Sequence, residues 1–267
     1  VLRLATQSKG GGEQRKMKKI GVSADWHHGS RFGLANQDYV SAHNLKHSDC
    51  LMLDEDFMGN RDLVGKLDYL LLLGDHADGY NPLEHGEDSI AEENLQVEMG
   101  TRYARAFKGS PKIYVLRGSR YHRGRGGGNL DERIAHEIQA VPDKYGKQAS
   151  PKRLLDIEGV RFSLAHKTTV SKSAWQYRGT PLGIRLVLSR LNKLEKDGAP
   201  YILIRAHCHT FTFLGFKTQL GVTCPCYSTD STFVQADAPE STPDVGMLYF
   251  EVDGDKFTWK PLCRGIM

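Results

Sequence analysis

Five short apolar runs in this chain end in an aspartate, a histidine, or a glycine turn beside one of them. No other feature constrains the fold as strongly, because short apolar runs bounded by turn residues are typical of buried strands. In open α/β sheets, functional sites assemble at the carboxyl ends of the strands. We therefore expect the polar residues at these ends to lie together. The five segments read SADWHHG from Ser23, LLGDHADG from Leu72, LRGSRYH from Leu116, SLAHK from Ser163 and IRAHCHTF from Ile204.

Helical periodicity separates the predicted strands, which is typical of an α/β protein. We predict helices over residues 88–107, 129–141 and 182–197, the last with Gly198 placed to cap its end. Residues 28–60 show little clear period and are expected to form a long loop with a helical part. The helix over 182–197 is predicted to have a single apolar stripe, formed by Ile184, Val187, Leu188, Leu191 and Leu194.

The chain beyond Phe211 is rich in Thr, Val, Phe and Tyr, which is typical of strands. The segments MLYFEV and KFTWKP are predicted strands, joined by a turn at Asp253-Gly254-Asp255. No internal repeat or linker is present, so residues 18–267 are expected to form one domain. The polar, basic residues 1–17 are expected to precede it as a flexible tail.

Composition excludes some classes of protein. No apolar run reaches the roughly 18 residues that a transmembrane helix requires. The N-terminal sequence lacks an apolar signal core, and the five cysteines are an odd number, so a reduced, cytoplasmic protein is the expectation. The net charge of +4 permits an anionic substrate, but it is modest for a nucleic-acid-binding module without chemistry.

The residue types at the strand ends indicate a metal site, because Asp and His together suit divalent ions such as manganese, iron and zinc. Each signal alone is weak, since a lone His at a strand end is more often a surface or hydrogen-bonded residue. The order along the chain is more specific. Asp-x-His is followed by Gly-Asp-x-x-Asp, a Gly near a His, a strand-end His and His-x-His.

With this ordered set, the chain resembles the calcineurin-like metallophosphoesterase superfamily over roughly residues 18–215. The resemblance implies a four-layer α/β/β/α sandwich with two mixed β-sheets, and we expect the C-terminal strands in the second sheet. It also implies two divalent transition metal ions, manganese, iron or zinc, and attack on a phosphate ester by a hydroxide that these ions hold.

The resemblance assigns the candidate ligands residue by residue. Asp25 and His27 would bind the first metal together with His209. Asp75 would bridge both metals, since a carboxylate has two oxygens to offer. In His207-Cys208-His209, alternate side chains of an extended segment point the same way, so both imidazoles can face one site. The resemblance implies that His166 and His207 bind the second metal.

The third motif departs from the family pattern, which is Gly-Asn-His followed by an acid. Here the segment reads Gly118-Ser119-Arg120-Tyr121-His122, so the Asn ligand is missing. Water or His122 could fill its place. Alternatively, His122 lies further out and acts in catalysis as general acid or phosphate donor, beside the metal-bridging Asp75. We favour this second role because the leaving oxygen needs a proton donor. Asp78 is expected to orient His27 or to cap a turn.

Basic residues flank His122 in a Gly-rich loop. Arg120 and Arg123 are the candidates for substrate binding, with a solvated basic loop as the alternative interpretation. Arg117 and Arg125 belong to the same run. A second cluster follows His166, and its aromatic residues could stack on a base, although a loop with a packed Trp is equally consistent. That cluster consists of Lys167, Lys172, Trp175, Tyr177 and Arg178.

These observations favour a metal-dependent phosphoric ester hydrolase, with a phosphodiesterase as the leading interpretation. The alternatives are a phosphomonoesterase, a DNA or RNA nuclease of the same fold, and a non-catalytic scaffold. Retention of all six metal-ligand positions other than the Asn argues against the scaffold. The expected partner is a phosphate-ester substrate, which includes nucleotides and nucleic acids, and no membrane is expected. The oligomeric state stays open.

Overall fold

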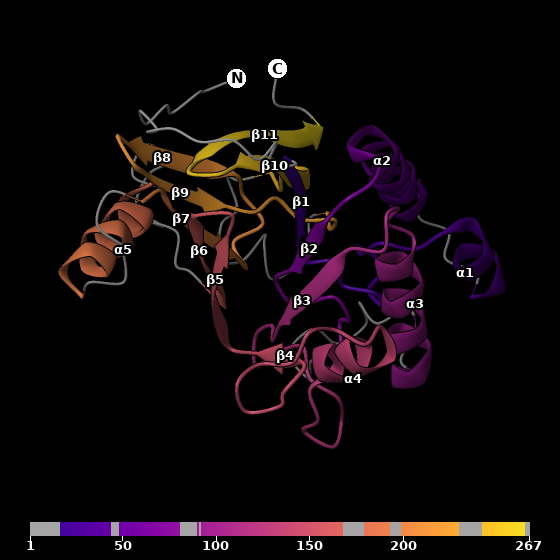
Figure 1. The fold of residues 1–267 in the computed structure, drawn as a ribbon. Coiled ribbons are helices and arrows are strands. Elements are labelled where there is room, and N and C mark those ends of the chain that lie inside the picture. Colours follow the sequence, from indigo (N-terminus) through magenta and orange to yellow (C-terminus); the bar gives the residue numbers. More distant parts are fainter. Residues whose placement is uncertain are drawn as a thin grey trace.

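The computed structural model describes residues 17–43, 48–80, 90, 92–167, 179–192, 199–229 and 242–264. The strands form two β-sheets, and helices cover both outer faces (Figure 1). The helices are α1 (Gln37–Ala42), α2 (Ser48–Val64), α3 (Glu93–Arg105), α4 (Leu130–Glu137) and α5 (Thr180–Leu191). The strands are β1 (Lys18–Ser23), β2 (Tyr69–Leu72), β3 (Lys112–Leu116), β4 (Ala149–Ser150), β5 (Lys152–Ile157), β6 (Val160–Lys167), β7 (Tyr201–Ala206), β8 (Thr212–Phe216), β9 (Gln219–Thr223), β10 (Val245–Asp253) and β11 (Lys256–Arg264).

The first sheet has the order β11-β10-β1-β2-β3-β4. Strands β1 to β4 run parallel, whereas β10 pairs antiparallel with β1. The prediction that the C-terminal strands join the second sheet is therefore wrong for β10 and β11, which contain the MLYFEV and KFTWKP segments. Almost all of β10 is buried on both faces, and such a strand requires a central position, which it has between β1 and β11. The predicted turn at Gly254 joins β10 to β11.

The second sheet has the order β5-β6-β7-β9-β8. Strands β6, β7 and β9 are parallel, and the outer strands β5 and β8 are antiparallel to their neighbours. All six residues of β7 are buried, as expected for a central strand. The sequence analysis missed β4 and β5. The alternating burial of β5 matches its position at the edge of the sheet.

The two sheets pack face to face around the largest apolar cluster, which contains Leu71 of β2, Phe162 of β6 and Phe250 of β10. A second cluster lies on the outer face of the first sheet, where Phe57 of α2 and Tyr103 of α3 pack. Helix α5 covers the outer face of the second sheet (Figure 1). The predicted four-layer α/β/β/α sandwich is confirmed.

Helix α5 buries a different face from the one predicted. Leu182 and Leu186 pack against Tyr201, Leu203 and Leu214 of the second sheet. The residues of the predicted stripe are 48–71% exposed from Ile184 to Leu191. This helix is apolar on two faces, and periodicity alone does not say which one meets the sheet. The predicted end of this helix, with its cap at Gly198, lies outside the described residues.

Two more differences concern the helical layer over the first sheet. The predicted long loop with a helical part over residues 28–60 has more helix than expected, because it contains α1 and most of α2. The buried residues of α2 are Cys50, Leu53, Phe57 and Val64, which is helical spacing. Apolar residues off this face, such as Leu63 at 63% exposure, blur the period. Helix α3 begins at Glu93 rather than at residue 88.

Two sequence-based expectations touch regions beyond these elements. The predicted tail lies outside the described residues except for Met17, so it stays a prediction. Among the helices of the described ranges, none combines the length and the apolar character that a membrane span needs.

Candidate metal centre

The loops that follow β1 and β2 lie side by side, because backbone hydrogen bonds continue the pairing of these strands beyond their ends. The N–H of Asp25 donates to the carbonyl of Gly74 at 3.0 Å, and the N–H of His27 donates to that of Asp75 at 3.1 Å. The N–H of His28 then donates to the carbonyl of His76 at 2.9 Å. The Asp-x-His and Gly-Asp motifs therefore meet at one sheet edge.

Five of the six predicted ligands have a left-handed backbone, which is uncommon for residues other than glycine. The φ angles are 52° at Asp25, 47° at His27, 53° at Asp75, 76° at His207 and 53° at His209. The expected extended segment over 207–209 is therefore wrong, since β7 ends at Ala206 and the chain turns sharply there. Strained backbone of this kind is characteristic of functional sites, where surrounding contacts hold it in place.

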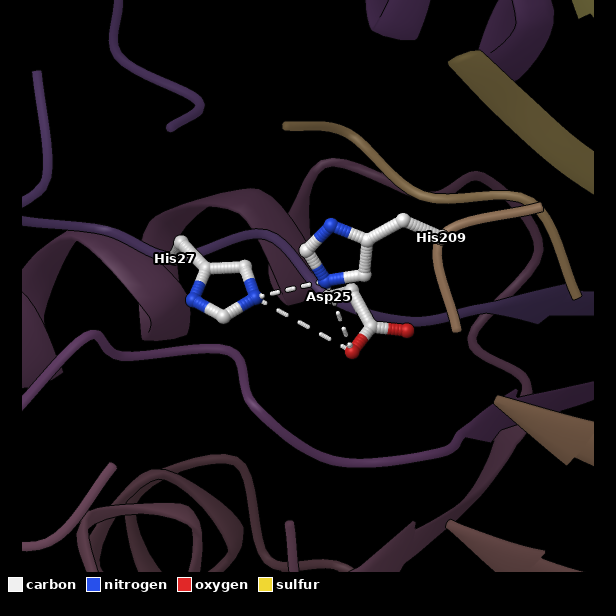
Figure 2. Close-up of side chains that lie close together, drawn as sticks. All are labelled: Asp25, His27 and His209. Carbon is white, nitrogen blue, oxygen red and sulfur yellow. Dashed lines mark hydrogen bonds and ion pairs between the residues drawn. The ribbon is translucent and has the colours of Figure 1, made fainter. Parts of the chain in front are cut away.

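The side chains of Asp25, His27 and His209 form a buried group at the ends of β1 and β7, and Figure 2 shows their polar atoms converging. The Nε2 atoms of the two histidines lie 3.1 Å apart. Asp25 Oδ1 lies 3.5 Å from Nε2 of His209 and 3.9 Å from Nε2 of His27. Tetrahedral nitrogen ligands of zinc lie about 3.3 Å apart, given bonds of about 2.0 Å, so these spacings fit one ion.

A second group consists of Asp75, His166 and His207. Asp75 Oδ2 lies 2.9 Å from Nε2 of His166 and 3.8 Å from Nδ1 of His207. The two histidine nitrogens lie 3.3 Å apart. Nε2 of His166 is also 4.0 Å from Oδ1 of Asp25, so the two groups adjoin. The structure thus brings all six predicted ligands together, in the two sets that the resemblance implies.

Two buried carboxylate oxygens indicate where cations would fit. Asp25 Oδ1 and Asp75 Oδ2 are buried without a hydrogen-bond donor. In His166, Nδ1 lies 2.8 Å from the carbonyl of Leu73, which is a pure acceptor, so this nitrogen carries the hydrogen. In the neutral ring, Nε2 then turns a lone pair toward the carboxylates. Lone pairs that converge on one space without hydrogens match a cation-binding site.

The charges of these groups depend on one another. Burial alone would raise the pKa of Asp25, but the nearby His209 and His166 favour its charged form and lower the pKa to about 2. Burial opposes protonation of His166, yet the adjacent Asp75 and Asp25 raise its pKa to about 9. Without a bound cation, a proton on His166 therefore compensates the carboxylate charge.

Asp75 differs in one respect from the expected bridging ligand. Its Oδ1 accepts a hydrogen bond of 2.7 Å from the backbone N–H of Ser119. Only Oδ2 therefore faces the histidines, so this is the oxygen that Asp75 would offer to a divalent ion. Ser119 contributes its backbone to the centre, while its Oγ accepts a hydrogen bond from the N–H of Tyr121.

His122 reaches into the centre despite its distance from Gly118 in sequence. Its Nδ1 lies 2.8 Å from the carbonyl of Asp78 and 3.2 Å from that residue's Oδ1, and its Nε2 lies 3.9 Å from Asp75 Oδ2. Asp78 also hydrogen-bonds Nδ1 of His27 at 3.0 Å, as expected of an orienting residue. His27, Asp78 and His122 form a third compact group. We interpret it as a hydrogen-bond network, because Nε2 of His27 already faces Asp25.

Asp131, which the sequence analysis missed, holds two of these loops together. This buried residue lies in the first turn of α4. Its Oδ2 accepts a hydrogen bond from the N–H of Gly118 at 2.8 Å and a longer one, 3.4 Å, from that of Asp75. Its Oδ1 accepts from the N–H of His76 at 3.2 Å and from Nδ1 of His76 at 2.7 Å. No signal in the sequence distinguishes it from an ordinary acidic residue at a helix start.

The predicted substrate-binding arginines lie at the surface beside His122. Arg120 and Arg123 are exposed. Arg117 is different, because its guanidinium pairs with Glu132 at 2.9 Å and so has a structural role. Of the second basic cluster, only Lys167 is described, and the aromatic residues expected there lie outside the described residues.

Comparison with known proteins gives similarity of structure without similarity of sequence. No family model matches the chain, and no curated protein matches it. Vps29 from Entamoeba histolytica, solved in complex with zinc, is 12% identical, with 92% of this chain and 98% of that chain covered and a TM-score of 0.45. YfcE, a phosphoesterase from E. coli, is 16% identical, with 91% and 93% covered and a TM-score of 0.42.

A predicted phosphoesterase from Streptococcus pneumoniae is 12% identical, with 92% of this chain and 91% of that chain covered and a TM-score of 0.37. These are proteins to which the chain is similar in overall structure. In the chain itself, two mixed sheets lie between helical layers, and the ordered Asp and His residues meet at the strand ends. This is the architecture implied by the resemblance to calcineurin-like metallophosphoesterases.

Proposed function

We propose that the protein is a metal-dependent hydrolase of phosphate esters, with phosphodiesters as its substrates. The observation that carries this proposal is the pair of adjoining buried groups, in which carboxylate oxygens without hydrogen-bond donors face imidazole nitrogens. Asp25, His27 and His209 would hold one divalent ion. Asp75, His166 and His207 would hold the other. Bound ions of this kind supply Lewis acidity to phosphoryl oxygens and lower the pKa of water.

His122 is proposed to give a proton to the leaving oxygen. Its Nδ1 is held by the backbone carbonyl of Asp78, which keeps a hydrogen on that nitrogen. Nε2 is therefore the atom that faces the centre, and a proton on it can pass to a leaving alkoxide. Arg120 and Arg123 lie within two residues of His122 in the chain and would add positive charge around the phosphoryl group. If His122 instead replaces the missing Asn, the same Nε2 is the ligand atom.

A diester suits the distribution of charge better than a monoester. In the described part of the centre, the carboxylates and most of the imidazoles are buried, whereas Arg120 and Arg123 are exposed beside it. A monoester dianion would benefit from cationic side chains that close around it. A diester has one charge and two ester groups that must extend from the site, which an open rim allows.

The test uses metal-stripped protein with manganese, iron or zinc added singly. We expect hydrolysis of bis(p-nitrophenyl) phosphate to exceed that of p-nitrophenyl phosphate, and bound metal to accompany activity. Asp75→Ala should abolish turnover, because this carboxylate belongs to the second group and faces three histidines. Asp38→Ala, at an exposed residue of α1, is the matched control. Full turnover by Asp75→Ala, or no metal and no activity with any ion, would contradict the proposal.

The outcome also separates the alternatives. A preference for the monoester would identify a phosphomonoesterase. Tight metal binding without hydrolysis of either ester would favour the non-catalytic scaffold.

A further inference from the structure

An arginine and a tyrosine stack at the surface beside the candidate metal centre. The guanidinium of Arg125 lies 5.0 Å from the centre of the Tyr80 ring, and Tyr80 is 39% exposed. We call this pair the Tyr80–Arg125 stack. Neither residue belongs to the ligand groups. The sequence analysis placed Arg125 in the basic run beside His122, but it did not identify Tyr80.

Backbone contacts hold the stack next to His122. The N–H of Tyr80 donates to the carbonyl of Arg123 at 2.8 Å. Gly79 has a φ of +74°, and a Cβ there would lie 2.6 Å from the Arg123 carbonyl oxygen and 2.8 Å from the carbonyl carbon of His122. The two loops thus touch backbone to backbone. Asp78, two residues before Tyr80, binds His122 directly, which connects the stack to the centre.

Arg120, Arg123 and Arg125, which we call the rim, are exposed. Within the described ranges, no carboxylate pairs with the side chain of Arg120, Arg123 or Arg125, in contrast to the pair between Arg117 and Glu132. Glu93 contacts the backbone of this loop, because it accepts a hydrogen bond from the N–H of Arg125. The cation paired with Glu93 is Arg133, whose Nη1 lies 3.7 Å from Oε2 of Glu93. Glu93 therefore anchors the loop without neutralising the guanidinium of Arg125.

An exposed aromatic ring with arginines beside it suits one class of phosphodiester. Unpaired bases stack on aromatic rings and on guanidinium planes, while neighbouring phosphates bind arginines. A duplex keeps its bases stacked on each other and would not use the ring. We propose, on the basis of the proposed function, that the substrate is single-stranded nucleic acid, with a base on the Tyr80–Arg125 stack and phosphates on Arg120 and Arg123.

The experiment compares a small diester with an oligonucleotide on the same manganese-loaded protein. The substrates are bis(p-nitrophenyl) phosphate, a labelled single strand of about 12 nucleotides as DNA or as RNA, and the corresponding duplex. The variants are Tyr80→Ala and Arg125→Gln. Tyr145→Ala is the matched aromatic control, because Tyr145 is also an exposed ring with a cation, Lys144, 4.9 Å from its centre. Arg190→Gln on α5 is the arginine control.

We expect each rim variant to lower kcat/KM for the single strand about tenfold more than for the small diester. The controls should not separate the two substrates. Equal losses on both substrates, a rim variant that behaves like its control, or a preference for the duplex would each overturn the inference.

A binding measurement distinguishes failure of this inference from failure of the proposed function. Fluorescence anisotropy with Asp75→Asn protein reports binding of the single strand without turnover. Arg123→Gln should reduce the dependence of log K on log salt by about 0.7, as expected for one lost phosphate contact. If no ion supports hydrolysis of the small diester, the proposed function is wrong whatever the binding result. Hydrolysis of the small diester without binding of the strand would overturn only the inference.

Discussion

Replacing Asp131 tests whether its carboxylate holds the two ligand loops in place. Asp131→Ala removes the acceptor for the N–H of Gly118 and for the N–H and Nδ1 of His76. A buried donor without a partner costs about 1–3 kcal/mol, so leaving two of these three unpaired would cost about 2–6 kcal/mol. This is a large part of the roughly 5–15 kcal/mol by which a typical domain is stable. Asp131→Asn retains one acceptor and should lose less.

The assay combines urea unfolding with metal content and turnover. Asp143→Ala is the matched control, because Asp143 likewise accepts several hydrogen bonds, from Tyr145, Lys147 and Ser150, but in a half-exposed turn. We expect both Asp131 variants to lose metal content, and Asp131→Ala to lose more stability than the control. If Asp131→Ala matches Asp143→Ala in unfolding and retains its metal, the residue does not position the loops.

The remaining predictions concern the centre itself. His122→Ala should lower turnover about 10²–10⁴-fold with metal content unchanged, and less so for a nitrophenolate leaving group, which needs little protonation; loss of one metal equivalent would instead make His122 a ligand. Gly118→Ala should reduce bound metal measured by elemental analysis, because the new Cβ would lie 1.8 Å from Asp75 Oδ1, and unchanged metal content would refute the reasoning. In the metal-free protein, the neighbouring carboxylates raise the pKa of His166 from 6.5 to about 9. The proton on His166 should therefore contribute its full stabilisation of the folded state below pH 6.5, and this stabilisation should disappear as the pH rises through 9. Zinc must displace the same proton, so its affinity measured by competition should increase over that interval, and His166→Gln should flatten both profiles.

Much of the candidate site follows from the sequence because its signals are local. An Asp or His directly after an apolar run is placed at a strand end by the strand itself, as Asp25 and His166 are. The order of these residues then matches one family pattern. The pattern does not include the residues that hold the ligand loops in place. Asp131 binds loops that lie 13 and 55–56 residues away in sequence, and no local spacing indicates such contacts.

The errors have a similar origin. The exposed stripe of α5 and its buried face, Leu182 and Leu186, have comparable apolar character, and the choice between them depends on the fit to Tyr201 and Leu203 across the sheet. The backbone at His207 was expected to be extended because β7 precedes it. Its φ of 76° reflects the turn that directs His207 to one ligand group and His209 to the other.

The sequence by itself determined the strand and helix alternation, the residue types at the strand ends and their order along the chain. These depend on periodicity and side-chain chemistry, which are properties of neighbouring residues. The tertiary structure alone decided that β10 lies beside β1, that Asp75 offers a single oxygen to the histidines, and that Tyr80 and Arg125 stack beside His122. Each of these depends on contacts between residues far apart in the chain, whose geometry is set only when the two sheets and their loops pack together.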